Sequence, residues 1–333
     1  IHFASPTLRV AVGGREAFVE GLVGHLGEQG VGLFVPAIDM DVFSPLAQAS
    51  TAGMERLGRW LRELDLRGQA SNLRFVVFRR QESWIHGYTA DLSGVAMKGY
   101  KGAPELIDGA ATVWGSGAHL LADVGVAHSF DMHFPEVFAE GWTLGGATGR
   151  LEALIRNGDF ALRGEDIRTS VDGAEIQGSF ALAQPKARYD KRLTLQLSGG
   201  PIEVPVAKQF IPYKLSAGLV NWLNDAPKGG LINGLDFAYQ GQIHVRRGEP
   251  ARRVALNATV QNARARFHED WPEISGLDGT VHVSGAQVKV AADAGTSLGV
   301  DLTGSVVRVR DNGDRVEADL RASSDGARML GFV

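Results

Sequence analysis

The side chains most able to do chemistry are scattered along this 333-residue chain and match no catalytic or metal-binding pattern. His268–Asp270 lacks the second histidine of a zinc-binding helix motif, so a solvated turn is the simpler interpretation. Asp39 and Asp41 lack the spacing and the glycine of a calcium loop, and Trp114–Gly117 lacks the glycine that a nucleophile elbow places two positions before its serine. We therefore expect a non-enzymatic protein without a metal or a cofactor.

The composition excludes several classes of protein. A net charge of −4 argues against a nucleic-acid partner, because a phosphate-binding surface needs a concentration of basic residues. The chain has no cysteine for a disulfide framework and no run of 18 apolar residues that would cross a bilayer as a helix. The 43 glycines match the turns of a β-rich protein, and the start at Ile1 without a methionine suggests a piece of a longer protein.

A helix followed by a strand is predicted within Phe210–Gln242, the segment around which the chain is organised. Gly229 and Gly230 are expected to end the helix. Apolar and polar residues then alternate from Leu235 to Tyr239, which is the period of a strand with one apolar face. The apolar residues that share one face of the predicted helix are Leu215, Leu219, Trp222 and Leu223.

The same helix and strand occur earlier in the chain, which is therefore built from a repeat. A second match joins residues 88–105 to residues 256–273 at a spacing of 168 positions. We predict the end of a preceding unit at 1–36, one unit at 37–200 and a second, truncated unit at 201–333. Within the first of these, residues 14–27 are expected to form a short helix or another strand pair. The residues matched at a spacing of 162 are Leu57 with Leu219, Trp60 with Trp222, Leu61 with Leu223, Gly68 with Gly230, Leu73 with Leu235, and Phe75 with Phe237.

Most of the remaining chain is predicted to form antiparallel strands with one apolar and one polar face. Hairpin turns are expected at Asn157-Gly158, Asp172-Gly173 and Asn312-Gly313, because positive φ favours Asn or Asp followed by Gly. Two or three short helices cannot cover the apolar face of about 18 strands. We therefore predict a mainly β fold, an elongated, curved, antiparallel repeating groove with short α-helices at the repeat boundaries. An ordinary β-sandwich core is the alternative.

Five segments resemble the YhdP branch of the AsmA-like envelope proteins of Gram-negative bacteria, and the likeness extends over nearly the whole chain. It depends on helix-and-strand modules in order rather than on catalytic residues, so it implies a fold and no chemistry. The segments are FVPAIDMDVFSPL (34–46), LDLRGQASNLRF (64–75), DIRTSVDGAEIQGSFAL (166–182), the stretch from Phe210 to Ile243, and WPEISGLDGTVHV (271–283).

The resemblance implies a segment of a bridge-like lipid-transfer protein. That family is similar to rods of repeating β-groove, anchored in the inner membrane, that cross the periplasm and move phospholipid to the outer membrane. The anchor would then lie outside this sequence, and outer-membrane or periplasmic proteins would be possible partners. Trp60 and Trp222 are expected to pack onto the sheet, with a role at a lipid headgroup boundary as the alternative.

A physical argument favours the same function. Exposing a lipid with about 30 methylenes to water costs on the order of 24 kcal/mol at ~0.8 kcal/mol per methylene, so a continuous apolar strip would remove most of the barrier. The alternatives are an envelope scaffold that binds proteins through sheet edges, and a carbohydrate-active solenoid, for which no periodic acidic pair is present. The residues predicted to line the groove are Ala174, Ile176, Phe180, Leu182, Leu193, Leu195, Leu197, Leu235, Phe237, Tyr239, Ile243, Val245, Val254, Leu256, Ala258 and Val260.

Overall fold

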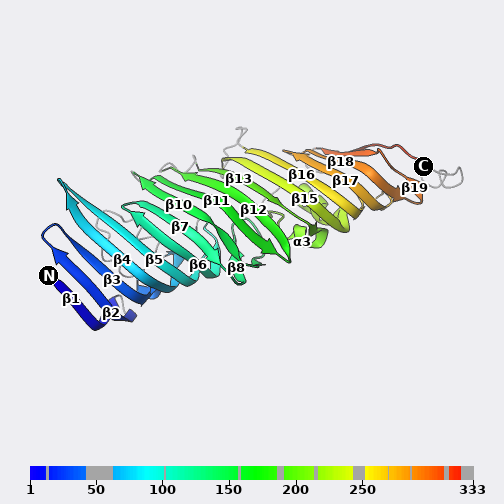
Figure 1. Ribbon diagram of the computed structural model, residues 1–333. Coiled ribbons are helices and arrows are strands. Elements are labelled where there is room, and N and C mark those ends of the chain that lie inside the picture. The colour runs from blue at the N-terminus through cyan, green and yellow to red at the C-terminus, as the bar shows by residue number, and fades with distance from the viewer. Residues whose placement is uncertain are drawn as a thin grey trace. The chain divides into compact units, whose positions relative to one another are not determined.

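Antiparallel strands dominate the computed structural model (Figure 1). The described part of the chain contains 21 strands and the short helices α3 and α4, which confirms the predicted mainly β architecture. The structure describes residues 1–12, 15–42, 63–100, 103–156, 159–185, 191–213, 217–242, 252–268, 270–285, 287–310 and 315–323.

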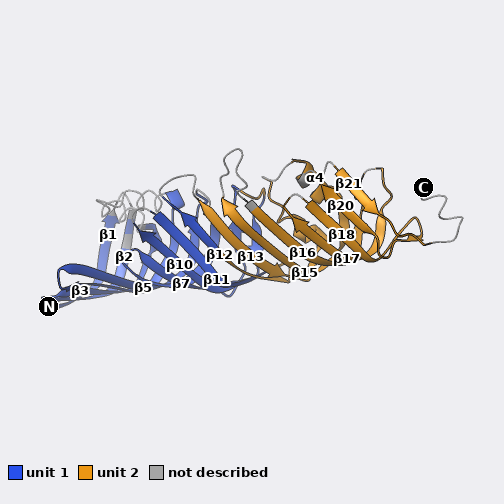
Figure 2. Ribbon diagram, turned by 90° about the horizontal axis from the view of Figure 1, so that it is seen from above, with its two compact units in different colours: residues 1–136, 140–170, 181–188 blue, residues 137–139, 171–180, 189–333 orange. Residues whose placement is uncertain are grey.

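The chain divides into two compact units, which Figure 2 colours separately. Unit 1 comprises residues 1–136, 140–170 and 181–188, and unit 2 comprises residues 137–139, 171–180 and 189–333. Within each unit the described strands belong to one antiparallel sheet, and no second sheet packs on it. This arrangement is an open sheet rather than the β-sandwich alternative. The predicted boundaries at 36 and 200 stay predictions.

Unit 1 is a meander in which most strands pair with their neighbours in the sequence. Strand β10 pairs with both β7 and β11, while the short strands β8 and β9 extend from β6. The strands are β1 (His2–Val12), β2 (Arg15–Gly27), β3 (Gly30–Asp39), β4 (Arg67–Arg80), β5 (Ser83–Met97), β6 (Glu105–Ser116), β7 (His119–Val126), β8 (Phe130–His133), β9 (Trp142–Leu144), β10 (Ala147–Arg156) and β11 (Asp159–Val171), with a 3-10 turn at Met40–Val42.

Unit 2 continues this pattern with the pairing order β13, β15, β16, β17, β18, β20 and β21. The division between the units falls within β12 (Ala174–Gln184). The other elements are β13 (Arg192–Gly199), β14 (Ile202–Glu203), α3 (Val204–Lys208), α4 (Ala217–Asp225), β15 (Pro227–Gln242), β16 (Arg252–Ala265), β17 (Ile274–Ser284), β18 (Gln287–Ser297), β19 (Val300–Asp301), β20 (Val306–Arg310) and β21 (Arg315–Asp319).

The helix predicted within Phe210–Gln242 ends earlier than expected. Helix α4 includes Leu219, Trp222 and Leu223 of the predicted helix, whereas Leu215 lies outside the described residues. The helix ends at Asp225 because β15 begins at Pro227, whose ring disfavours helical backbone in the residue before it. Gly229 and Gly230 therefore lie inside β15, and the prediction that they end the helix is wrong. Of the earlier helix, including Trp60, only Glu63 and Leu64 fall within the described residues, and both are helical.

The structure also tests two predictions of local structure. Residues 15–27 form one strand, β2, which pairs with β1 and β3. The segment is therefore β as one alternative had it, but it is a single strand rather than a strand pair, and the helical alternative is wrong. Asp172 and Gly173 join β11 to β12 with φ values of 47° and 82°, as expected for a tight hairpin turn. The predicted turns at 157–158 and 312–313 lie outside the described residues.

The repeat extends to the backbone conformation of equivalent residues. Gly68 and Gly230, 162 positions apart, have φ values of +118° and +112°. Positions 168 apart also agree, because the left-handed pairs are Gly94 with Asn262, Asp108 with Gly276, and Gly117 with Gly285. Irregularities in strand pairing fall at matching places, after Leu92 and after Val260. Each module therefore bends its strands at the same points.

Gly230 gives a direct test of this bend. A Cβ atom there would lie 2.9 Å from the Cβ of Ala263, and the left-handed φ is itself unfavourable for an L-residue. Gly230→Ala is expected to lower the free energy of unfolding by about 2–3 kcal/mol. Gly234→Ala in the same strand is the control, because an added Cβ meets nothing within 4 Å. Equal urea midpoints for the two variants would contradict the assigned bend.

Each unit has its own apolar core. In unit 1 the buried side chains include Val19, Val35, Ile38, Met40 and Ala70, which come from β2, β3, β4 and the 3-10 turn. In unit 2 the core is larger and lies mainly on β16, β17, β18 and β20. In each unit the core lies on the apolar face of that unit's own sheet.

Candidate functional site

Two apolar rows cross unit 2 at right angles to its strands. In each row the residues stand directly opposite one another on neighbouring strands, as the pairing register shows. The first row is Leu197, Phe237, Leu256, Val283, Val288, Val309 and Val316, and it passes through seven strands from β13 to β21. The second row is Leu235, Ala258, Val281, Val290, Val307 and Ala318.

The exposure of the first row changes along its length. Leu197, Phe237 and Leu256 are half-buried, so part of each side chain stays accessible. Val288 and Val309 are only 3% and 1% exposed, because the core of unit 2 closes around them. A ligand could therefore contact the row along β13, β15 and β16, whereas its far end is packed within the protein.

Helix α4 contributes to this packing through Trp222. The indole Nε1–H of Trp222 donates a hydrogen bond to the backbone carbonyl oxygen of Phe267 at 3.2 Å, and the two rings stack with their centroids 6.2 Å apart. Trp222 also packs against the core cluster of unit 2. The expectation that this tryptophan packs onto the sheet is confirmed.

The structure brings most of the predicted site residues together on one face. Leu195, Tyr239 and Val254 stand opposite one another and form a further short row beside the first. Strand β12 adjoins β13, since a Cβ on Gly178 would lie 2.6 Å from a methyl carbon of Leu197. Ala174, Ala258 and Val260 are buried, and the half-buried predicted residues are Ile176, Phe180, Leu182, Leu193, Leu195, Leu197, Leu235, Phe237, Tyr239, Val254 and Leu256. Ile243 and Val245 lie outside the described residues.

A comparable row in unit 1 was not among the predicted site residues. Gly115 stands opposite Tyr88, whose phenol would collide with a side chain at that position, and burial raises the pKa of Tyr88. The repeat could have revealed this row, because Phe75 matches Phe237 and Tyr88 matches Leu256. Its members are Leu33, Phe75, Tyr88, Gly115, Leu120, Ala153 and Leu162.

The opposite face of unit 1 carries paired polar side chains beside exposed apolar residues such as Phe78 and Leu154. Asp91 accepts hydrogen bonds from the Asn72 amide at 2.8 Å and the Thr112 hydroxyl at 2.9 Å, and these bonds hold the pKa of Asp91 below its usual range. Arg150 donates to Asp123 at 2.9 Å on the neighbouring strands. Because side chains alternate along a strand, these groups point away from the apolar row.

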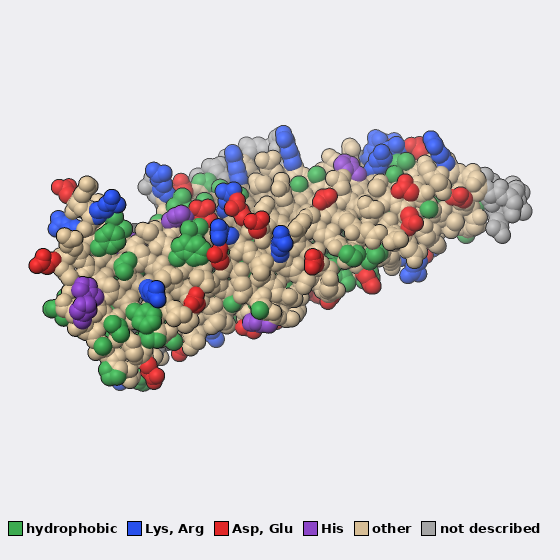
Figure 3. Space-filling view, viewed as in Figure 1, with side chains coloured by type: hydrophobic (Ala, Val, Ile, Leu, Met, Phe, Trp, Pro, Cys, Tyr) green, Lys and Arg blue, Asp and Glu red, His purple; other side chains and the backbone are tan. Residues whose placement is uncertain are grey.

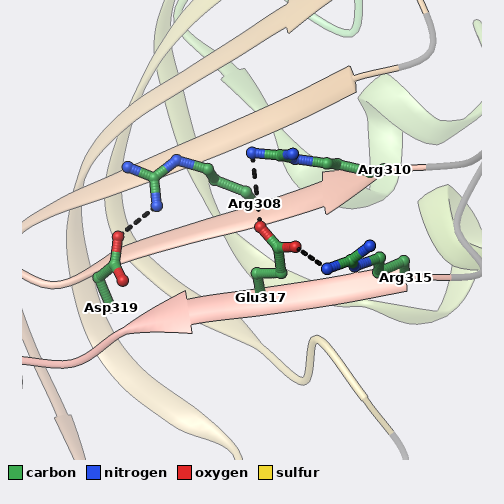
Figure 4. A network of polar contacts seen from close by, with 5 residues as sticks. All are labelled: Arg308, Arg310, Arg315, Glu317 and Asp319. Carbon is green, nitrogen blue, oxygen red and sulfur yellow. Dashed lines mark hydrogen bonds and ion pairs between the residues drawn. The ribbon is translucent and has the colours of Figure 1, made fainter.

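The opposite face of unit 2 follows the same rule at β20 and β21 (Figure 4). Arg308 pairs with Asp319, and Glu317 lies between Arg315 at 2.7 Å and Arg310 at 3.4 Å. Charged side chains of both signs are spread over the face visible in Figure 3. Such exposed pairs contribute little stability, so their main effect is to keep this face in water.

Little in the described residues could hold a metal. No group of three or more His, Asp or Glu side chains there is placed to bind an ion. His268 and Asp270 lie 3.5 Å apart, close to the turn expected for this segment. None of the helices in the described part is long and apolar enough to cross a membrane.

The fold and this site define a class of protein: an open antiparallel β-sheet with continuous apolar rows on one face, which are half exposed along part of their length. The comparison with family models then gives the family. The model of the YhdP protein family matches residues 3–333, so the chain belongs to this family. Searches of curated proteins and of solved structures returned no match.

Proposed function

We propose that this chain is a segment of a hydrophobic groove that conducts phospholipids between the inner and outer membranes, in the periplasm and without catalysis or a cofactor. One observation supports this most strongly: an apolar row runs through seven consecutive strands, and its β13–β16 part is half exposed. Membership of the YhdP family supports a role in lipid transport in the envelope.

The row suits an acyl chain better than a compact ligand. Val283 on β17 is also half-buried, so the accessible part of the row extends over the four strands β13, β15, β16 and β17. Strands are spaced ~4.8 Å apart, so these four span roughly 14 Å, close to half of a ~30 Å hydrocarbon core. An acyl chain laid along the row would cover side chains that otherwise meet water, at a gain of about 0.8 kcal/mol per buried methylene. The polar headgroup would stay in solvent at the open side.

Lipid analysis of two neighbouring variants tests the proposal. The purified chain is expected to carry phospholipid detectable by mass spectrometry, and Phe237→Asp should reduce it several-fold because a charge then interrupts the row. The control is Ala238→Asp, since Ala238 is exposed on the opposite face of the same strand. A lipid-free wild-type chain, or equal loss in both variants, would contradict the proposal and favour an envelope scaffold with protein partners.

A further inference from the structure

The inward face of the β4–β5 hairpin changes in polarity from the turn towards the middle of the sheet. Arg79 stands opposite Trp84 next to the turn, Val77 stands opposite His86 one step further in, and Phe75 stands opposite Tyr88 beyond them. Residues two apart on a strand share a face, so all six lie on the side of the unit 1 row. From the turn inwards, the cross-strand pairs are therefore a cation with an indole, an apolar residue with an imidazole, and two large aromatic rings.

Arg79 is available to an external ligand. Its backbone N–H donates to the carbonyl oxygen of Gln29 at 2.7 Å, which fixes the main chain, while its side chain is exposed. No ion pair of the described residues involves Arg79, whereas Arg150 is paired with Asp123. Trp84 is 63% exposed although it is among the largest apolar side chains in the chain. An unpaired cation beside an exposed indole is a common arrangement at the boundary between hydrocarbon and headgroup.

The distances along β4 match the dimensions of a lipid. A strand rises about 3.3 Å per residue, so Phe75 lies roughly 13 Å and Leu73 roughly 20 Å from Arg79 along the chain. Half of a bilayer hydrocarbon core is about 15 Å. A lipid with its phosphate at Arg79 would therefore place its tails on Val77, Phe75 and Leu73, and it would reach the unit 1 row.

The second module has an arginine in the corresponding cross-strand pair of its sequence. In β15 and β16 the pair equivalent to Arg79 and Trp84 is Gly241 and Arg252, at spacings of 162 and 168 positions. The register thus places one arginine in this row of each hairpin, although on the other strand. This recurrence is independent of the polarity order seen in β4 and β5.

We propose that Arg79 and Trp84 form a docking site for the phosphate headgroup of a phospholipid whose tails run along β4 and cross the unit 1 row at Phe75. This inference rests on the proposed function and adds to it the residues that bind the headgroup. The guanidinium donates two parallel hydrogen bonds to phosphate oxygens, and the indole covers the glycerol region. A lipid without phosphate would keep its contacts with the tails and lose those with Arg79.

Competition between two lipids with the same tails tests this site. The purified chain is loaded from an equal mixture of dioleoyl phosphatidylglycerol and dioleoylglycerol, and both are counted by mass spectrometry. The wild-type chain should be enriched in the phospholipid, and Arg79→Gln should lower the ratio roughly threefold to tenfold with total lipid unchanged. Arg80→Gln is the matched control, because Arg80 is the next residue and lies on the opposite face.

The outcomes separate this inference from the proposed function. An unchanged ratio in Arg79→Gln would overturn the headgroup site while lipid still binds. Failure of the wild-type chain to bind either lipid would overturn the proposed function itself. Inorganic phosphate at millimolar concentration should not displace the phospholipid, and displacement by phosphate alone would identify a simple anion site instead. Equal melting curves of the two variants would show that the effect is not one of folding.

Discussion

Val309→Asp is expected to unfold unit 2. Val309 is 1% exposed and stands between Val288 and Val316 in the first apolar row. A buried carboxylate without a partner costs more than about 4 kcal/mol, which is a large part of the ~5–15 kcal/mol that stabilises a typical domain. Circular dichroism in urea should show the loss of the unit 2 transition at a far lower concentration than for the wild-type chain.

The neighbouring residue provides the control for this experiment. Arg308 points to the opposite face, where it pairs with Asp319. Arg308→Ala should change the free energy of unfolding by no more than about 1 kcal/mol, because exposed ion pairs contribute little. If Val309→Asp unfolded at the same urea concentration as Arg308→Ala, the far end of the row would be open to water, contrary to the packing described above.

Trp222→Ala is also expected to destabilise unit 2. The substitution removes the stacking on Phe267 and the hydrogen bond to its carbonyl, and it opens a cavity under helix α4. Full truncation of a buried tryptophan costs about 3–5 kcal/mol, so we expect about 2–3 kcal/mol for this half-buried one. The measurement is the free energy of unfolding by far-UV circular dichroism, which does not depend on indole fluorescence.

Two comparisons sharpen the Trp222 experiment. Trp222→Phe keeps an aromatic ring but loses the N–H donor. It should therefore lower the free energy of unfolding by less than Trp222→Ala does, and the difference is the contribution of ring packing. Trp84→Ala should change stability by less than about 0.5 kcal/mol, because Trp84 is mostly exposed. Equal losses for Trp84→Ala and Trp222→Ala would mean that α4 does not pack on the sheet through its tryptophan.

The strands were predictable from sequence because their faces alternate with period 2. Leu235 to Tyr239 and Leu193 to Leu197 alternate clearly, and both fall in strands with the expected inward face. Glycines were harder to interpret: Gly230 could mean either the end of a helix or a bend in a strand. Only the approach of the neighbouring strand at Ala263 distinguishes the two.

The rows themselves could not be predicted from sequence. Val281, Val283, Val288 and Val290 alternate with polar residues as clearly as the predicted site residues do, yet they were not recognised as part of the site. Alternation gives the face of each residue but not its partner on the next strand, and a row exists only when the register is known. Burial at the far end likewise depends on how the core closes over β18 and β20, which involves residues distant in sequence.

The same dependence on register limits which changes in length the chain can tolerate. Adding or deleting one residue inside β15 would turn Phe237 to the water side and bring a polar neighbour into the row, whereas the strands on either side would keep their positions. One such event would leave an interruption across the whole width of the row. Variation in length should therefore be confined to the hairpin turns, where an extra residue shifts no face.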